Sequence, residues 1–178
     1  MNNKIKWRDL KFLAEFLEDM EWEAELLGEE TPYPSLKAAL PMDEDYDETV
    51  LFTYIDLPDE DAEFTKYLQI YLQIPLDLET IPAGEMIVFV NQLNILTLLG
   101  GFSYIPKILE NAARVDYRYV LPVEKDALPD EGVVGEVLLN LVKYAQMAEG
   151  LIARRIEGTP MEAIIAAIQK EIVDGEEP

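Results

Sequence analysis

The sequence predicts an α+β fold: an antiparallel sheet of two hairpins, with a fifth short strand as an option, and helices packed on one face. Residues 64–76 alternate apolar and polar side chains with the period of two that a half-buried strand requires. Several other stretches repeat apolar residues every three or four positions, which is the period of a helix. The expected order is α-β-β-(β)-α-β-β-α, followed by an extra C-terminal helix.

The first predicted element is an amphipathic helix over residues 5–27. Its apolar stripe follows a spacing of three and four residues: Leu10, Leu13, Leu17, Met20, Ala24 and Leu27. Gly28 is expected to end the helix, and Pro32 and Pro34 favour an extended connection after it. Residues 35–40 are the optional short strand, and the acidic run 43–48 is a loop.

The first predicted hairpin pairs residues 49–57 with residues 64–76, across a break that begins at Pro58. The buried side of the second strand is apolar: Leu68, Ile70, Leu72, Ile74 and Leu76. Its other side carries tyrosines and amides: Tyr67, Gln69, Tyr71 and Gln73. Such amphipathic side chains suit a protein surface, so this row is a candidate peptide-binding face. The alternative is a strand side that faces solvent or a covering helix.

The central predicted helix lies between Pro82, which a first helical turn tolerates, and a C-terminal cap at Gly100-Gly101. Its apolar run is shorter than the ~20 residues needed to cross a bilayer. One face is purely apolar: Met86, Phe89, Val90, Leu93 and Leu96. The opposite face mixes apolar residues with amides, and its candidate dimer or partner residues are Ile87, Asn91, Asn94, Ile95 and Leu98. The sheet can cover only one face, so the other needs another helix, a second subunit or a client.

The second half of the chain predicts another hairpin and two helices. Residues 102–109 pair with residues 114–121, and a long helix follows over 130–156. A capping pattern at Thr159, Pro160 and Glu162 starts the last helix, over 160–173. We expect a single domain over residues 1–173 and an acidic tail at 174–178.

The composition excludes several classes of function. The chain has no cysteine and no histidine, which removes disulfides, thiolate chemistry, a histidine base and imidazole-bound metals. Its 36 acidic and 14 basic residues give a net charge of −22. Phosphate backbones and anionic lipid would be repelled, so neither nucleic acid nor a membrane is expected as a partner. The start of the sequence shows no signal peptide, which fits a cytoplasmic setting.

No motif for catalysis or metal binding passes its test. The acidic loop resembles a calcium loop at Asp43, Asp45 and Asp47, but its sixth and twelfth positions are Glu48 and Tyr54 instead of glycine and glutamate. The glycines match neither a P-loop nor a dinucleotide fingerprint. Acidic residues are so abundant that a carboxylate pair carries no information. We therefore expect no catalytic residue, no metal and no cofactor.

Three segments of the chain resemble the type III secretion chaperone-like fold, including the YbjN-type proteins. They are the strand over 64–76, the stretch from Asn94 through Gly100-Gly101 to Phe102, and the strand from Val115 to Pro122. The resemblance spans residues 5–156. It implies a small, acidic, homodimeric protein that is not an enzyme, holds an extended client segment, and uses its central helix in the dimer. The helix over 160–173 lies beyond the usual end of the fold, where it would cap the dimer surface or the client groove.

Three hypotheses follow from the sequence. The first is a non-catalytic protein-binding module, acting as a homodimer that binds a protein or peptide partner. The second is an acidic decoy that imitates nucleic acid for a basic partner. The third is a carboxylate- or metal-dependent enzyme.

Overall fold

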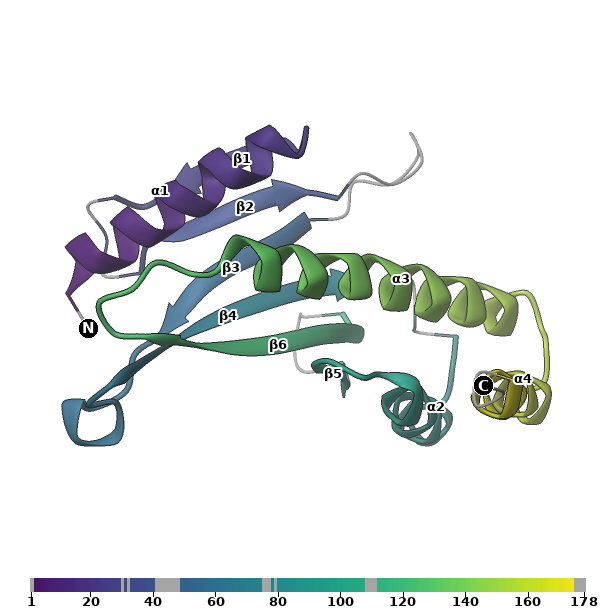
Figure 1. Ribbon diagram of the computed structural model, residues 1–178. Coiled ribbons are helices and arrows are strands. Elements are labelled where there is room, and N and C mark those ends of the chain that lie inside the picture. The colour runs from purple at the N-terminus through teal and green to yellow at the C-terminus, as the bar shows by residue number, and fades with distance from the viewer. Residues whose placement is uncertain are drawn as a thin grey trace. The chain divides into compact units, whose positions relative to one another are not determined.

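The computed structural model describes residues 2–29, 31, 33–40, 49–74, 78, 80–107 and 112–174. In this part of the chain, six strands form one sheet in the order β1-β2-β3-β4-β6-β5, and four helices accompany them (Figure 1). The α+β class predicted from the sequence is confirmed. The elements are α1 (Asn3–Asp19), β1 (Ala24–Leu27), β2 (Ser35–Ala39), β3 (Thr49–Ile55), the 3₁₀ turn η1 (Asp59–Asp61), β4 (Thr65–Ile74), α2 (Ala83–Leu96), β5 (Gly101–Ile105), β6 (Arg114–Glu124), α3 (Glu131–Ile156) and α4 (Met161–Asp174).

The chain divides into two compact units, each made from two separate stretches. The first unit contains Met1–Leu72 and Arg118–Leu139, and the second contains Gln73–Tyr117 and Asn140–Pro178. The boundaries fall inside β4, β6 and α3, so these three elements each contribute to both units. The single domain expected over residues 1–173 stays a prediction, and most of the expected acidic tail, residues 175–178, lies outside the described residues.

In the first unit, α1 packs on β1, β2 and β3. Its stripe residues Leu10, Leu13 and Leu17 are fully buried. The strands pair antiparallel, and the register places Phe52 of β3 between Leu36 of β2 and Ile70 of β4. These three side chains are also fully buried, so they form the core beneath α1. The hairpin predicted between residues 49–57 and 64–76 is confirmed as β3 and β4.

The helix predicted over residues 5–27 is wrong beyond Asp19. The chain reverses at Glu21, whose φ of 64° lies in the left-handed region that normally favours glycine. The backbone N–H of Trp22 donates to Leu17 O at 2.9 Å, and that of Glu21 donates to Glu18 O at 2.9 Å. These are the two hydrogen bonds of a Schellman helix end.

The residues that continue the apolar stripe past this reversal form β1, because the new chain direction brings them alongside β2. Leu26 lies opposite Leu36, and Glu25 lies opposite Lys37. The optional strand over residues 35–40 is present as β2. The first unit therefore has one strand more at its edge than the sequence predicts.

In the second unit, α2 contacts β5 and α4. Four of the five residues on its predicted apolar face are buried: Met86, Phe89, Val90 and Leu93. The helix ends at Leu96, where both the backbone N–H and the hydroxyl of Thr97 donate to Leu93 O. The cap expected at Gly100-Gly101 is therefore wrong. The helix ends because the backbone of Thr97 turns extended, with φ −81° and ψ 109°, and Gly101 instead begins β5.

The remaining elements agree with the sequence prediction. β5 and β6 are neighbours in the sheet, as the second hairpin requires, although residues 108–111 of its expected turn lie outside the described residues. The Asp130 carboxylate accepts a hydrogen bond from Val133 N at 2.9 Å and so caps the start of α3. The C-terminal helix is present as α4.

Candidate functional site

The predicted partner face of α2 is exposed to solvent in the second unit. Ile87, Val88, Ile95 and Leu98 are 54, 46, 62 and 81 % exposed. Asn91 is exposed as well. Ile87, Asn91 and Ile95 are spaced by four residues and therefore lie along one line of the helix. We call this row, with Val88, Asn94 and Leu98, the α2 face. Large apolar side chains clustered in water mark a surface that another molecule can cover.

The α2 face lies in a charge-free part of the chain. Residues 86–106 contain no Asp, Glu, Lys or Arg, whereas 28 % of the whole chain is charged. The nearest charged residue before it is Glu85, which accepts a hydrogen bond from Arg155 Nε at 2.8 Å. That hydrogen bond raises the pKa of Arg155. The core of a protein–protein interface is similarly depleted of charge.

The Asn94 amide has a structural role that the sequence did not reveal. Its Nδ2 donates to Phe102 O at 3.0 Å, and its Oδ1 accepts from Phe102 N at 2.7 Å. β5 is the last strand in the sheet order, so none of the strands in the described ranges pairs with its outer edge. The amide therefore occupies both backbone groups of one residue on that edge, as a neighbouring strand would.

Two buried tyrosines hold the loop that presents Leu98. The backbone N–H of Leu98 donates to the Tyr144 hydroxyl at 2.8 Å, and the Tyr117 hydroxyl donates to Leu99 O. The Tyr117 ring also packs edge-on against Phe102, with ring centroids 5.2 Å apart. Leu98 is thus exposed on a loop whose backbone is fixed. Sequence reasoning missed both tyrosines, because no local pattern shows that their hydroxyl groups reach the backbone of Leu98 and Leu99.

The second unit also contains two hollows lined by α4. A cavity of about 550 Å³ is lined by Glu85 and Val88 of α2, by Arg155, and by Glu162 and Ile165 of α4. A smaller one, of about 270 Å³, has mainly apolar lining from α2, α3 and α4. The first is continuous with the α2 face through Val88. The C-terminal helix therefore extends the surface that α2 presents.

The predicted peptide-binding row lies mostly in the first unit. Tyr67, Gln69 and Tyr71 are half-buried and point to the side of β4 opposite its core residues. The register places Ile55, Thr53 and Leu51 of β3 beside them, in that order. The fourth residue of the row, Gln73, is exposed and belongs to the second unit.

A buried network of charged side chains lies on the covered side of the same strands. Asp9 of α1 is fully buried, and its Oδ2 lies 2.5 Å from Lys66 Nζ of β4. The same oxygen accepts a hydrogen bond from the Tyr54 hydroxyl at 2.8 Å, and Oδ1 accepts from Arg8 Nη2 at 2.7 Å. Lys66 also donates to Ala127 O at 2.5 Å. These bonds tie α1 to β3, β4 and the residues before α3.

Burial and the adjacent Asp9 carboxylate raise the pKa of Tyr54 well above its usual range. A second buried lysine, Lys6, donates to Asp56 Oδ2 at 2.6 Å. Sequence reasoning missed this network. The signal was present, because Lys6 and Asp9 each precede a stripe leucine of α1 by four residues and Lys66 occupies a core-facing position of β4.

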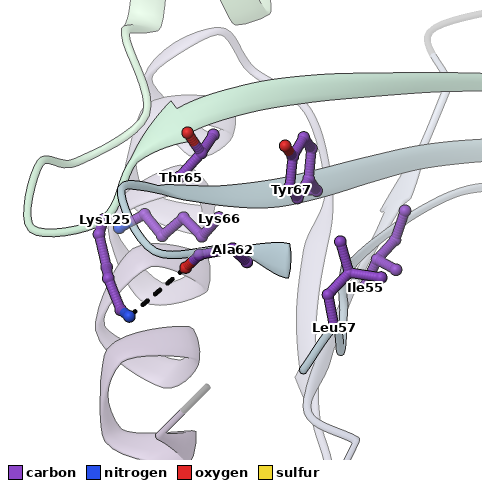
Figure 2. Close-up of a pocket in the computed structure, with 7 residues that line it drawn as sticks. All are labelled: Ile55, Leu57, Ala62, Thr65, Lys66, Tyr67 and Lys125. Carbon is purple, nitrogen blue, oxygen red and sulfur yellow. Dashed lines mark hydrogen bonds between the residues drawn. The ribbon is translucent and has the colours of Figure 1, made fainter. Parts of the chain in front are cut away.

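The cavity next to this network is too small for a substrate. It has a volume of about 20 Å³ and is lined by Ile55, Leu57, Ala62, Thr65, Lys66, Tyr67 and Lys125 (Figure 2). That is room for about one water molecule. Figure 2 shows the Lys125 side chain closing one side, where its Nζ donates to Ala62 O at 3.5 Å. This cavity therefore gives the Asp9–Lys66 pair no room for a reacting molecule.

Among the described residues, no three acidic side chains gather as a metal ion would require. The acidic loop tested as a calcium site, from Asp43 to Glu48, lies outside these residues. None of the helices in the described ranges combines the length and apolar character of a membrane span.

Comparisons with known proteins include a solved structure of similar fold. No protein-family model matches the chain, and no similar curated protein was found. The fold is similar to the crystal structure of YbjN from E. coli, described there as a candidate transcription regulator. The two chains share 14 % sequence identity over 82 % of this chain and 92 % of that chain, with a TM-score of 0.48. This is the type of protein that the sequence resembles.

Proposed function

We propose that this protein is a non-catalytic protein-binding module that works as a homodimer, with the α2 face in the dimer interface. The observation that carries the proposal is the exposure of Ile87, Ile95 and Leu98 on an ordered, charge-free surface. Burying apolar surface against a second molecule is favourable by roughly 25 cal/mol for each Å² that is removed from water.

A second copy of the chain suits this face for an electrostatic reason. Each copy carries a net charge of −22, so two copies repel each other wherever their charged surfaces meet. Residues 86–106 form a stretch without any charge, and a twofold axis brings the same stretch of both copies together. Asn91 lies on the line between Ile87 and Ile95, so its amide could pair with the Asn91 amide of the second copy.

A non-catalytic role is supported by how the polar groups of the first unit are used. The buried side chains of Lys66 and Tyr54 both bond the Asp9 carboxylate, beside a cavity of about 20 Å³. Catalytic groups need a reacting atom within hydrogen-bonding reach. This network instead links a helix to a sheet, which is a structural task.

The proposal is tested by measuring the molar mass in solution at two protein concentrations, for the natural protein and for Leu98→Asp and Ile95→Asp. We expect a dimer for the natural protein and a monomer for both variants, because each places a carboxylate in an apolar interface. The matched control is Phe64→Asp, at a side chain that is 74 % exposed in the first unit.

The control variant should remain a dimer with the mass of the natural protein. A natural protein that is monomeric at both concentrations contradicts the proposal, provided that its circular dichroism shows it to be folded. A dimer that survives both α2 substitutions contradicts the choice of face.

A further inference from the structure

One side of the sheet in the first unit is accessible, and over most of β2, β3, β4 and β6 its outward positions are free of acidic residues. We call it the open face, and it consists of the outward positions of β2, β3, β4 up to Tyr71, and β6 from Arg118 to Pro122. None of these positions is Asp or Glu, although the chain contains 36 acidic residues among 178. Such a gap in so acidic a chain distinguishes this surface from its surroundings.

The open face carries two cations and a row of amphipathic side chains. Lys37 of β2 and Arg118 of β6 are exposed, on either side of the β3–β4 hairpin. Between them lie half-buried side chains, which are Leu51, Thr53, Ile55, Tyr67, Gln69 and Tyr71. Among the described residues, acidic side chains at its margins are Glu25, opposite Lys37 in β1, Glu124, at the far end of β6, and Asp116, the next residue on the same side of β6 beyond Arg118.

The two sides of these strands differ sharply in burial. The inward residues of β3 and β4, such as Phe52, Leu68 and Ile70, have no exposed surface. The outward residues from Thr49 to Ile55 and from Thr65 to Tyr71 all keep partial exposure. The helix α1 contacts β2 and β3, whose inward residues Leu36 and Phe52 are fully buried, so α1 covers the inward side and leaves the outward side accessible.

We propose that the open face binds an acidic, amphipathic peptide segment of a partner protein, in which carboxylates alternate with apolar side chains. The carboxylates would pair with Lys37 and Arg118, and the apolar side chains would pack on Tyr67, Tyr71 and Leu51. Alternation suits an extended segment, whose successive side chains point to opposite sides. This inference rests on the proposed protein-binding function, and it does not depend on the dimer.

The net charge of the chain does not prevent an acidic partner from binding here. At physiological ionic strength, charges more than ~8 Å apart are largely screened, so the carboxylates far from Lys37 and Arg118 oppose an acidic partner only weakly, and Glu25 is the near exception. A basic segment would find no carboxylate on the open face and would be drawn to the rest of the surface. The charge pattern therefore favours an acidic partner at this location.

The experiment uses the full chain and a short, terminally blocked peptide of alternating glutamate and leucine. Binding is followed by fluorescence anisotropy, and the site is mapped by backbone amide NMR shifts. We expect saturable binding, shifts confined to β2, β3, β4 and β6, and an affinity that falls as salt is added. The double variant Lys37→Glu/Arg118→Glu should raise the Kd by about tenfold or more.

The matched control is Lys4→Glu/Lys11→Glu, which makes the same change of net charge at two exposed residues of α1. It should leave the Kd within about twofold of the natural value. A second variant, Tyr67→Ala, tests the apolar contribution without changing any charge, and it should also weaken binding.

Three results would overturn the inference. The first is equal weakening by both charge-reversed double variants, which indicates a net-charge effect alone. The second is tighter binding of a lysine–leucine peptide at the same strands. The third is a different molar mass in solution for Lys37→Glu/Arg118→Glu than for the natural protein. That result would show that two copies of the chain contact each other through the open face. If the protein is a dimer but does not bind the acidic peptide, only the inference about the open face is wrong. If it is a monomer that binds the peptide, only the proposed homodimer is wrong.

Discussion

Lys66 Nζ lies 2.5 Å from Asp9 Oδ2, and neither side chain is more than 2 % exposed. The pair joins β4 to α1 in the core of the first unit, which also buries the Lys6 side chain. Its hydrogen bonds to Tyr54 and to Ala127 O compensate for taking two charges out of water. A buried pair of this kind is a weak source of stability while intact, but it is costly to break.

Asp9→Ala is expected to lower the free energy of unfolding by about 3–5 kcal/mol, because it leaves the Lys66 ammonium buried without its counter-charge. Chemical denaturation measures the change. The control is Glu15→Ala, whose carboxylate is 66 % exposed and 4.0 Å from Lys11 Nζ. It should cost less than about 0.5 kcal/mol. The double variant Asp9→Ala/Lys66→Met should recover part of the loss, and a loss as large as that of Asp9→Ala alone would argue against an unpaired charge as the cause.

Stability is expected to decrease at alkaline pH through Tyr54. Burial and the Asp9 carboxylate raise the pKa of Tyr54 in the folded protein, whereas in the unfolded chain the phenol ionises near pH ~10. Below that pH both states hold the proton and there is no effect. Above it the unfolded state loses the proton first, so the free energy of unfolding falls by about 1.4 kcal/mol per pH unit.

Denaturation at a series of pH values measures how the free energy of unfolding changes with pH. Tyr54→Phe should remove the part of this slope that comes from the ionisation of Tyr54. Tyr33→Phe, at a tyrosine that is 72 % exposed, controls for the loss of a hydroxyl group elsewhere. If Tyr54→Phe keeps the full slope of the natural protein, the raised pKa is not the cause.

Glu21→Gly is expected to stabilise the protein by about 1 kcal/mol, because glycine adopts the left-handed conformation without the steric cost of a side chain. Thermal or chemical denaturation measures the gain. Glu18→Gly is the matched control within the same helix, where glycine should instead cost about 1 kcal/mol. Destabilisation by both substitutions would contradict a strained Glu21.

The two hydrogen bonds of Asn94 are expected to be separable by substitution. Asn94→Asp can still accept from Phe102 N but cannot donate to Phe102 O, whereas Asn94→Ala loses both bonds. We expect Asn94→Ala to cost about 1–3 kcal/mol, and to raise the rate of aggregation measured by light scattering, because it uncovers the outer edge of β5. Aggregation as slow as that of the natural protein would show that the amide does not protect this edge.

The repeating patterns of the sequence were sufficient to predict most of the elements. The alternation around Leu68 and Ile70 identified β4, and the apolar residues on both sides of the central helix indicated that the sheet could cover only one of them. These inferences depend on side-chain periodicity, which is a local property of the chain. The α+β class followed from them.

What periodicity did not reveal depends on single residues in uncommon roles. Glu21 ends α1 in a conformation usually left to glycine, so the apolar stripe appeared to continue through Ala24 and Leu27. Asn94 was assigned to the partner face, whereas its amide is bonded to Phe102. The Asp9–Lys66 pair joins residues far apart in sequence, and no local pattern states that two such charges meet.

The passage of β4, β6 and α3 through both units affects how the protein can be made. During synthesis on the ribosome, the first unit cannot be completed until Leu139 has emerged, and by then only the first stretch of the second unit is present. No single cut of the chain separates the two units. Engineering a half-size version would require rejoining distant stretches rather than truncating either terminus.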